Sequence, residues 1–137
     1  MKIMAIDLGT ARTGLAFSDL SGFLAGRSIT VTEHARSRLL EAIGKEIAAE
    51  KPGRIVVGLP LNMNGTEGPR AQLCREFAAA VEEATGLPVK LWDERRTTVE
   101  AHQILSDHNY HGKKRKDTVD AVAASLILEG YLAFLGR

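Results

Sequence analysis

The chain has 137 residues, of which 45% are hydrophobic and 26% charged, and this size and composition fit one globular domain over residues 1–137. A single cysteine, Cys74, excludes an internal disulfide. No apolar run approaches the roughly 20 residues that span a bilayer, and the N-terminus is charged too early for a secretory signal. We therefore expect a cytoplasmic protein with no membrane partner, and the net charge of +1 points to no other class of partner.

Three strands are predicted at the start of the chain, over residues 3–8, 13–18 and 23–31. The first of these runs is nearly all apolar, which is typical of a strand buried on both faces. The turn residues Gly9-Thr10-Ala11 separate the first two runs, so we expect these two strands to pair antiparallel.

Two helices and a strand are predicted in the middle of the chain. The first helix runs from about residue 35 to 50, with apolar residues at helical spacing: Leu39, Leu40, Ile43 and Ile47. A short apolar run at 55–59, bounded by Pro60, indicates a buried parallel strand. The second helix runs from about 69 to 85, and its predicted apolar stripe consists of Leu73, Phe77, Val81 and Ala84.

The last part of the chain predicts a strand at 89–92, a short helix at 97–107 that opens with capping-box spacing, and a final helix at 117–135. The polar, basic segment 108–116 between the two helices is expected to be a loop. This order of elements predicts an α/β fold. We expect a mixed five-stranded sheet, three antiparallel strands followed by two parallel ones, with helices on both faces.

Acidic residues fall where two predicted strands end. Asp7 closes the first strand, and Asp93 and Glu94 close the last. Ligands of open α/β sheets bind outside the carboxyl ends of the strands. If one strand separates these two ends, their backbones lie about 10 Å apart, because neighbouring strands are spaced by about 4.8 Å. The side chains could then share one metal ion, or they could simply be solvated strand ends.

A third acid, Asp120, lies near the start of the final helix. The helical period places it on one face with Ala123, Ala124 and Ile127, which suggests close packing on the sheet. An ionised carboxylate there needs a partner or a ligand, although a first-turn Asp also interacts favourably with the helix dipole. Three converging carboxylates would suit a hard cation, which prefers oxygen ligands.

Two loops have the residues of phosphate-handling turns. Gly9 and Thr10 follow the first strand, where a glycine permits close backbone approach and a hydroxyl can donate. Asn62, Asn64 and Gly65 follow the predicted strand at 55–59, where plain turn chemistry explains them equally well.

Positive charge gathers near the acids. The run of Lys113, Lys114, Arg115 and Lys116 immediately precedes Asp120, and such charges hold phosphate backbones, although a charge run can also be a solvated surface. Arg95 follows Glu94 and could clamp a phosphate. The four histidines lack a cysteine partner near in sequence, so surface histidines explain them better than a zinc site does.

Four segments together resemble the YqgF family. They are Met4–Thr10 with Arg12 and Gly14, Val57–Gly65, Asp93–Thr98 with Glu100 and Ala101, and Asp120–Ala124 running on to Leu128. Each motif is modest alone, but their order and spacing agree over essentially the whole chain. Members of this family are described as Holliday junction resolvases and as the nuclease that matures the precursor of small-subunit ribosomal RNA.

The resemblance implies an RNase H-like fold with catalytic and metal-binding acids at Asp7, Glu94 and Asp120. Adjacent strand residues face opposite ways, so only one of Asp93 and Glu94 should point at the metal, and the resemblance favours Glu94. The expected cofactor is Mg²⁺, with Mn²⁺ as an alternative. The residues expected to contact nucleic acid are Gly9, Thr10, Arg12, Asn62, Asn64, Gly65, Arg95, Thr98, Lys113, Lys114, Arg115 and Lys116.

The sequence therefore predicts a metal-dependent nuclease, most consistent with maturation of the 5′ end of pre-16S rRNA. RNA is favoured over branched DNA because a junction resolvase needs a symmetric dimer, and we find no self-complementary apolar patch in the sequence. A monomer or weak dimer acting on pre-ribosomal particles is expected. The alternatives are a Holliday junction resolvase, a non-catalytic RNA-binding or ribosome-maturation module, and an ATP-using actin-like phosphotransferase.

Overall fold

The computed structural model describes residues 1–22, 24–93 and 112–135, and in the last range it describes side chains from Ala121 onward. Its elements are β1 (Ile3–Asp7), β2 (Arg12–Ser18), β3 (Ala25–Thr32), α1 (Arg36–Glu50), β4 (Arg54–Leu59), α2 (Pro69–Thr85), β5 (Val89–Asp93) and α4 (Gly112–Leu135). The predicted short helix at 97–107 lies outside the described residues.

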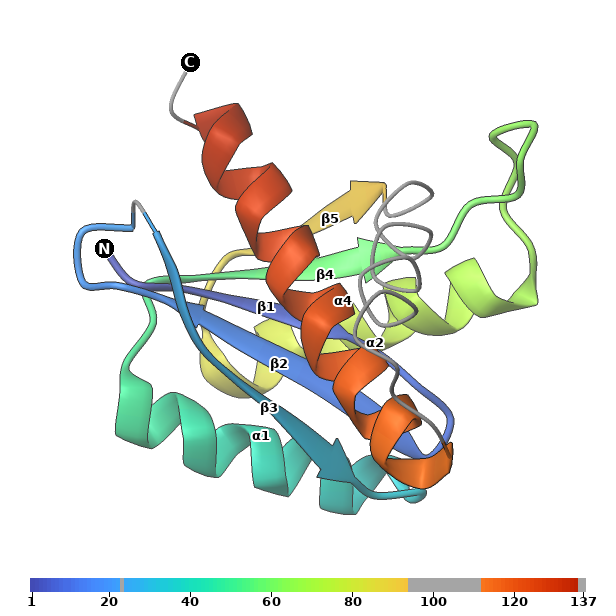
Figure 1. Ribbon diagram of the computed structural model, residues 1–137, viewed down its shortest axis with the longest axis horizontal. Coiled ribbons are helices and arrows are strands. Elements are labelled where there is room, and N and C mark those ends of the chain that lie inside the picture. Colours follow the sequence, from blue (N-terminus) through green and yellow to red (C-terminus); the bar gives the residue numbers. More distant parts are fainter. Residues whose placement is uncertain (23, 94–111, 136–137) are drawn as a thin grey trace.

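The five strands form one mixed sheet in the order β3-β2-β1-β4-β5 (Figure 1). β1, β2 and β3 pair antiparallel, whereas β4 pairs parallel with β1 and β5 pairs parallel with β4. This is the predicted arrangement of three antiparallel strands and two parallel ones. β1 lies at the centre, where it is hydrogen-bonded on both edges.

The two faces of the sheet carry separate cores because alternate residues of β1 point to opposite sides. Met4 and Ile6 belong to a core that α1 and α2 cover. Ile3 and Ala5 belong to a second core with residues of α4, including Ile127. Figure 1 shows α4 crossing one face of the sheet, with α1 and α2 on the other. The prediction of helices on both faces is confirmed.

The buried face of α2 differs from the predicted stripe. Phe77 and Val81 are buried as expected, but Leu73 is 44% exposed and Ala84 is also exposed. The side chains that enter the core are Ala71, Cys74, Phe77, Ala78 and Val81. The helix is rotated so that small residues face the sheet, which brings α2 close to it and leaves Leu73 at the margin. Cys74 therefore has a packing role.

The final helix begins earlier than predicted, since α4 starts at Gly112 and includes the basic run 113–116. The prediction of a loop over these positions was wrong. Lys and Arg have high helix propensity, so a basic run can extend a helix whose later residues pack on a sheet. Of the helices in the described ranges, none is both long and apolar enough to cross a membrane.

The different burial of two leucines on this face predicts unequal effects of the same substitution. Leu39→Ala in α1 should lower the free energy of unfolding by about 2–5 kcal/mol, because a Leu side chain that is 4% exposed leaves a cavity. Leu73→Ala in α2 should lower it by less than about 1 kcal/mol, since that side chain is 44% exposed. Urea denaturation of both variants measures the difference. Equal losses would mean that Leu73 belongs to the core after all.

Candidate functional site

The carboxyl ends of β1, β4 and β5 meet at one edge of the sheet, which we call the carboxyl edge. Asp7 is the last residue of β1 and Asp93 the last of β5, and β4 alone lies between these strands. The two backbones are thus about two strand spacings apart, or about 10 Å. The predicted placement of these strand ends is confirmed.

Asp7 lies on the α4 face of the sheet. Ile6 enters the core of α1 and α2, and Ala5 enters the core of α4, so the alternation puts Asp7 on the same side as Ala5. Its antiparallel partner is Gly14 in β2. On the β4 side, Ile6 of β1 pairs with the residue just before Gly58, so Gly58 lies beside Asp7. Neither glycine places a side chain beside this half-buried carboxylate.

Asp93 lies on the opposite face. Leu91 packs against the core of α1 and α2, whereas Trp92 packs against the core of α4. The alternation therefore places Asp93, which is exposed, on the side of Leu91 and away from Asp7. Asp7 and Asp93 are thus poorly arranged to share one ion. Glu94, Arg95 and Thr98 lie outside the described residues.

The start of α4 approaches the same edge as Asp7. Near the other end of the helix, the Tyr131 hydroxyl accepts a hydrogen bond of 3.1 Å from Arg54, at the beginning of β4. From Tyr131 back to Asp120 the helix rises about 16 Å, close to the roughly 13 Å that β1 rises from Ile3 to Asp7. Asp120 therefore lies about 16 Å from Tyr131 along the helix, towards the end of α4 that Figure 1 shows on the side of the sheet where β1 ends.

The described side chains alone do not complete a metal site. Among them, no three acids, histidines or cysteines gather closely enough to hold an ion. Of the three predicted ligands, only Asp7 has a described side chain, and Asp120 has a described backbone.

The turn between β1 and β2 requires a glycine at position 9 for its own geometry. A Cβ atom there would lie 1.7 Å from the carbonyl oxygen of Arg12. The Gly9 amide donates to Thr13 Oγ1 at 3.3 Å, and the Thr13 side chain is fully buried. Local packing therefore explains Gly9 without a phosphate. Thr10 is exposed in this turn, and Arg12 is half-buried where β2 begins.

Arg70 is a site residue that the sequence analysis missed. From the first turn of α2, its guanidinium donates to the Leu8 carbonyl and, at 3.5 Å, to the Thr10 hydroxyl. It therefore holds the turn that follows Asp7. An arginine in the first turn of a helix, where acids are usually favoured, was the available signal.

The loop after β4 is closed by its own hydrogen bonds. Asn64 Oδ1 accepts from the Thr66 hydroxyl at 2.6 Å, and the Asn62 side-chain amide donates to that hydroxyl at 3.0 Å. Gly65 has a φ of 86°, which favours glycine. Turn chemistry thus accounts for all three predicted residues. Beside the loop, a hydrogen bond from Arg75 holds the pKa of Glu67 below its ordinary value and keeps it charged.

The four basic residues Lys113 to Lys116 occupy the first turns of α4. The structure describes their backbone only. Figure 1 shows this end of α4 on the side of the sheet where β1 ends, and the nearness of the basic run to Asp7 stays a prediction.

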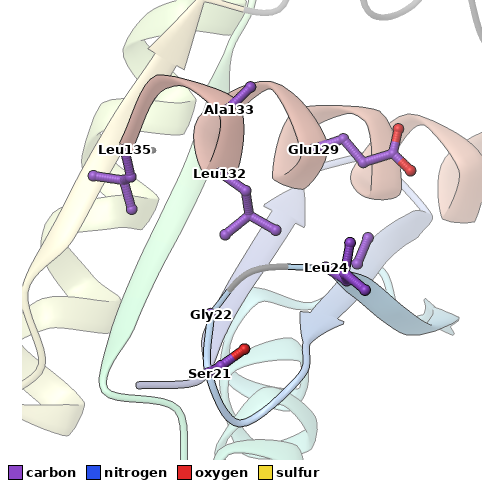
Figure 2. A pocket seen from close by; sticks show the side chains of 8 residues that line it. Ser21, Gly22, Leu24, Glu129, Leu132, Ala133 and Leu135 are labelled. Carbon is purple, nitrogen blue, oxygen red and sulfur yellow. The ribbon is translucent and has the colours of Figure 1, made fainter. Parts of the chain in front are cut away.

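A large hollow lies at the opposite end of the sheet (Figure 2). It has a volume of about 760 Å³ between the β2–β3 hairpin and the last turns of α4. Leu24, Leu132 and Leu135 line it, and Glu129 is its one acidic residue among the described side chains. This apolar hollow is unsuited to binding a cation, so the candidate site remains at the carboxyl edge.

Solved structures of junction-cleaving enzymes share this fold. The chain is similar to Thermus thermophilus RuvC bound to a Holliday junction, with a TM-score of 0.63, 13% identity, and coverage of 100% of this chain and 97% of that one. It is also similar to the Fowlpox virus resolvase in complex with junction DNA, with a TM-score of 0.62, 12% identity and full coverage of both chains. At such identities the likeness shows the fold alone, which is the predicted RNase H-like fold.

The family follows from sequence comparison. A family model described as "RuvX: Holliday junction resolvase" matches residues 1–133. A protein of Lachnospira eligens is 44% identical over 135 residues, covering 96% of each chain. One of Pelotomaculum thermopropionicum is 41% identical over 138 residues, covering 100% of this chain and 90% of the relative. Both are named "Putative pre-16S rRNA nuclease". The chain belongs to the RuvX family, also called YqgF.

The geometry of the β1–β2 turn predicts opposite outcomes for two Gly→Ala changes. Gly9→Ala should lower the free energy of unfolding by more than about 1 kcal/mol, because its Cβ meets the Arg12 backbone. Gly44→Ala, in α1, should raise it by about 0.4–1 kcal/mol, because nothing lies within 4 Å of the added methyl group. Thermal unfolding of both variants is the measurement. A fully stable Gly9→Ala protein would show that the turn tolerates a side chain.

Proposed function

We propose that this chain is a divalent-metal-dependent nuclease that cleaves RNA and matures the 5′ end of pre-16S rRNA. The observation that carries the proposal is the position of Asp7. Its carboxylate ends a buried central strand between two glycines, on the face where α4 begins. Membership of the RuvX family and the names of the relatives support the same activity.

The site suits a hard cation. An acid at the carboxyl edge supplies oxygen ligands, and the neighbouring strand positions 14 and 58 are glycines, which place no side chain beside it. Asp7, Glu94 and Asp120 would hold Mg²⁺, or Mn²⁺ in its place. When bound, the metal would polarise the scissile phosphate and lower the pKa of a bound water.

Support for Glu94 over Asp93 comes from the strand alternation. Asp93 is on the α1 and α2 side of the sheet, whereas Asp7 is on the α4 side. Asp120 is supported by the helical period, because Ala124 and Ile127 of the same row are buried against the sheet. Residues outside the metal site would hold the RNA strand. They are Thr10, Arg12, Arg95, Thr98 and the basic run Lys113 to Lys116.

A Holliday junction resolvase is the second candidate, because the family model that matches this chain is described as one of Holliday junction resolvases. Equal amounts of a single-stranded ribosomal-precursor RNA and a four-way DNA junction, incubated with Mg²⁺ and with Mn²⁺, separate the two. We expect faster initial cleavage of the RNA. Paired symmetric cuts in the junction by a stable dimer, with the RNA left intact, would favour the resolvase.

Two Asp→Asn changes at the carboxyl edge test the metal site. Asp7→Asn should abolish cleavage and leave the protein folded, because the amide keeps the shape and removes the ligand charge. Asp93→Asn makes the same chemical change on the opposite face, so it should retain most of the activity. Initial rates with Mg²⁺ and circular dichroism are measured for both. Full activity of a folded Asp7→Asn protein would contradict the assignment.

The basic run is tested by changing Lys113, Lys114, Arg115 and Lys116 to Ala. RNA binding should weaken for every sequence, and the log–log salt slope should become less steep by about 0.7 for each lost phosphate contact. The helix should persist, because Ala is the best helix former. A control with Arg38→Ala and Lys45→Ala in α1 should keep the wild-type slope. Equal slopes in all three proteins would show that the run serves only solubility.

A further inference from the structure

A second hollow lies at the carboxyl edge, on the side of the sheet away from Asp7. It has a volume of about 200 Å³, and it is formed by the β1–β2 turn and the starts of α1 and α2. Leu8, the residue after Asp7, lines it and packs against the core of α1 and α2. The hollow and the proposed metal site are therefore on opposite sides of one short turn.

The rim of this hollow is polar and mainly basic. Its polar members are Thr10, Glu33, His34, Arg36 and Arg70. The two guanidiniums outweigh the single carboxylate, so the rim has a net positive charge even with the histidine neutral. The floor consists of leucine side chains and a phenylalanine. An anionic group with a small volume fits this combination.

Arg70 is held in position before any ligand arrives. Its guanidinium donates to the Leu8 carbonyl and the Thr10 hydroxyl, and its side chain is half-buried. A guanidinium has five N–H donors in a rigid plane, and these two contacts use only some of them. The remaining donors can bind a phosphate oxygen at little further loss of side-chain freedom.

The sequence at both helix starts favours an anion here. α1 begins at Arg36 and α2 has Arg70 in its first turn, and neither helix has an acid in the first turn or a side-chain cap. A cation at a helix N-terminus is unfavourable with respect to the helix dipole. A bound anion would satisfy both the helix ends and the arginines.

We propose that this hollow binds a backbone phosphate of the RNA strand next to the one that is cut. The inference rests on the proposed nuclease function and names a contact of the same substrate. The hollow is smaller than the about 300–1,000 Å³ typical of pockets for drug-sized ligands, so it suits a phosphate group better than a whole nucleoside. The strand would cross the carboxyl edge over Thr10, from the α4 side to the α1 and α2 side.

The test compares two Arg→Gln changes in α1. Arg36 lines the hollow, whereas Arg38 is exposed on the same helix outside it. Binding of a fluorescent single-stranded RNA is measured by anisotropy without divalent ions, over a range of salt concentrations. Arg36→Gln should weaken binding about tenfold and reduce the salt slope by about 0.7. Arg38→Gln should match the wild type, and equal behaviour of the two variants would overturn the proposal.

Arg70→Gln provides a second variant at the same hollow. It should weaken RNA binding at least as much as Arg36→Gln, and because it also releases the turn beside Asp7, it should slow cleavage of bound RNA. The double variant should lose no more of the salt slope than one phosphate contact explains. A loss of two contacts would place the arginines on separate phosphates and overturn a shared subsite.

The source of the phosphate is distinguished by chemical-shift mapping of the wild-type protein. RNA should shift the Arg36 and Thr10 amide signals at lower concentration than inorganic phosphate does, and Arg36→Gln should reduce both responses. Shifts with inorganic phosphate and none with RNA would assign the hollow to a free anion instead. RNA binding by the wild type without any cleavage would refute the nuclease and leave this subsite standing.

Discussion

The arrangement of the whole molecule depends on β1, a central strand that is hydrogen-bonded on both edges and covered on both faces. Its alternating side chains supply two separate cores, one under α1 and α2 and one under α4. A charged side chain within such a strand would be buried, so the first position that suits one is at the end of the strand, where the covering helices no longer exclude solvent. Asp7 stands at that point, so its carboxylate lies at the boundary between a dry interior and the solvent.

The turn after β1 is held in one conformation by contacts with the elements around it. The backbone at Gly9 comes so close to Arg12 that a side chain at position 9 does not fit. The buried Thr13 hydroxyl accepts a hydrogen bond from the Gly9 amide. Arg70 then ties the outer side of the turn to α2. The turn after Asp7 is thus held by contacts from two elements, β2 and α2, and a catalytic carboxylate would need supporting contacts of this kind.

The sequence predicted the mixed sheet and the strands that end in Asp7 and Asp93 because their signals are local. Apolar runs of strand length, a glycine turn and helical spacing are all readable within a few residues. The face of the sheet on which Asp93 lies depends on the register of β5, and the packing of Leu91 and Trp92 shows it only in the folded chain. Arg70 is 62 residues from Leu8, so no local pattern could show their contact.

The proposed site joins a helix near the end of the chain to a strand that ends at residue 7, and this requires α4 to approach the sheet closely. Ala124 is fully buried against a face that presents Ala5 and Ala16, so small side chains meet small side chains. At the far end, Gly130 leaves just enough space for Trp92, whose indole nitrogen would lie 3.2 Å from an added Cβ. These contacts set the tilt of the helix. Because α4 is one continuous helix from Gly112 to Leu135, the packing around Gly130 contributes to the direction in which its first turns lie.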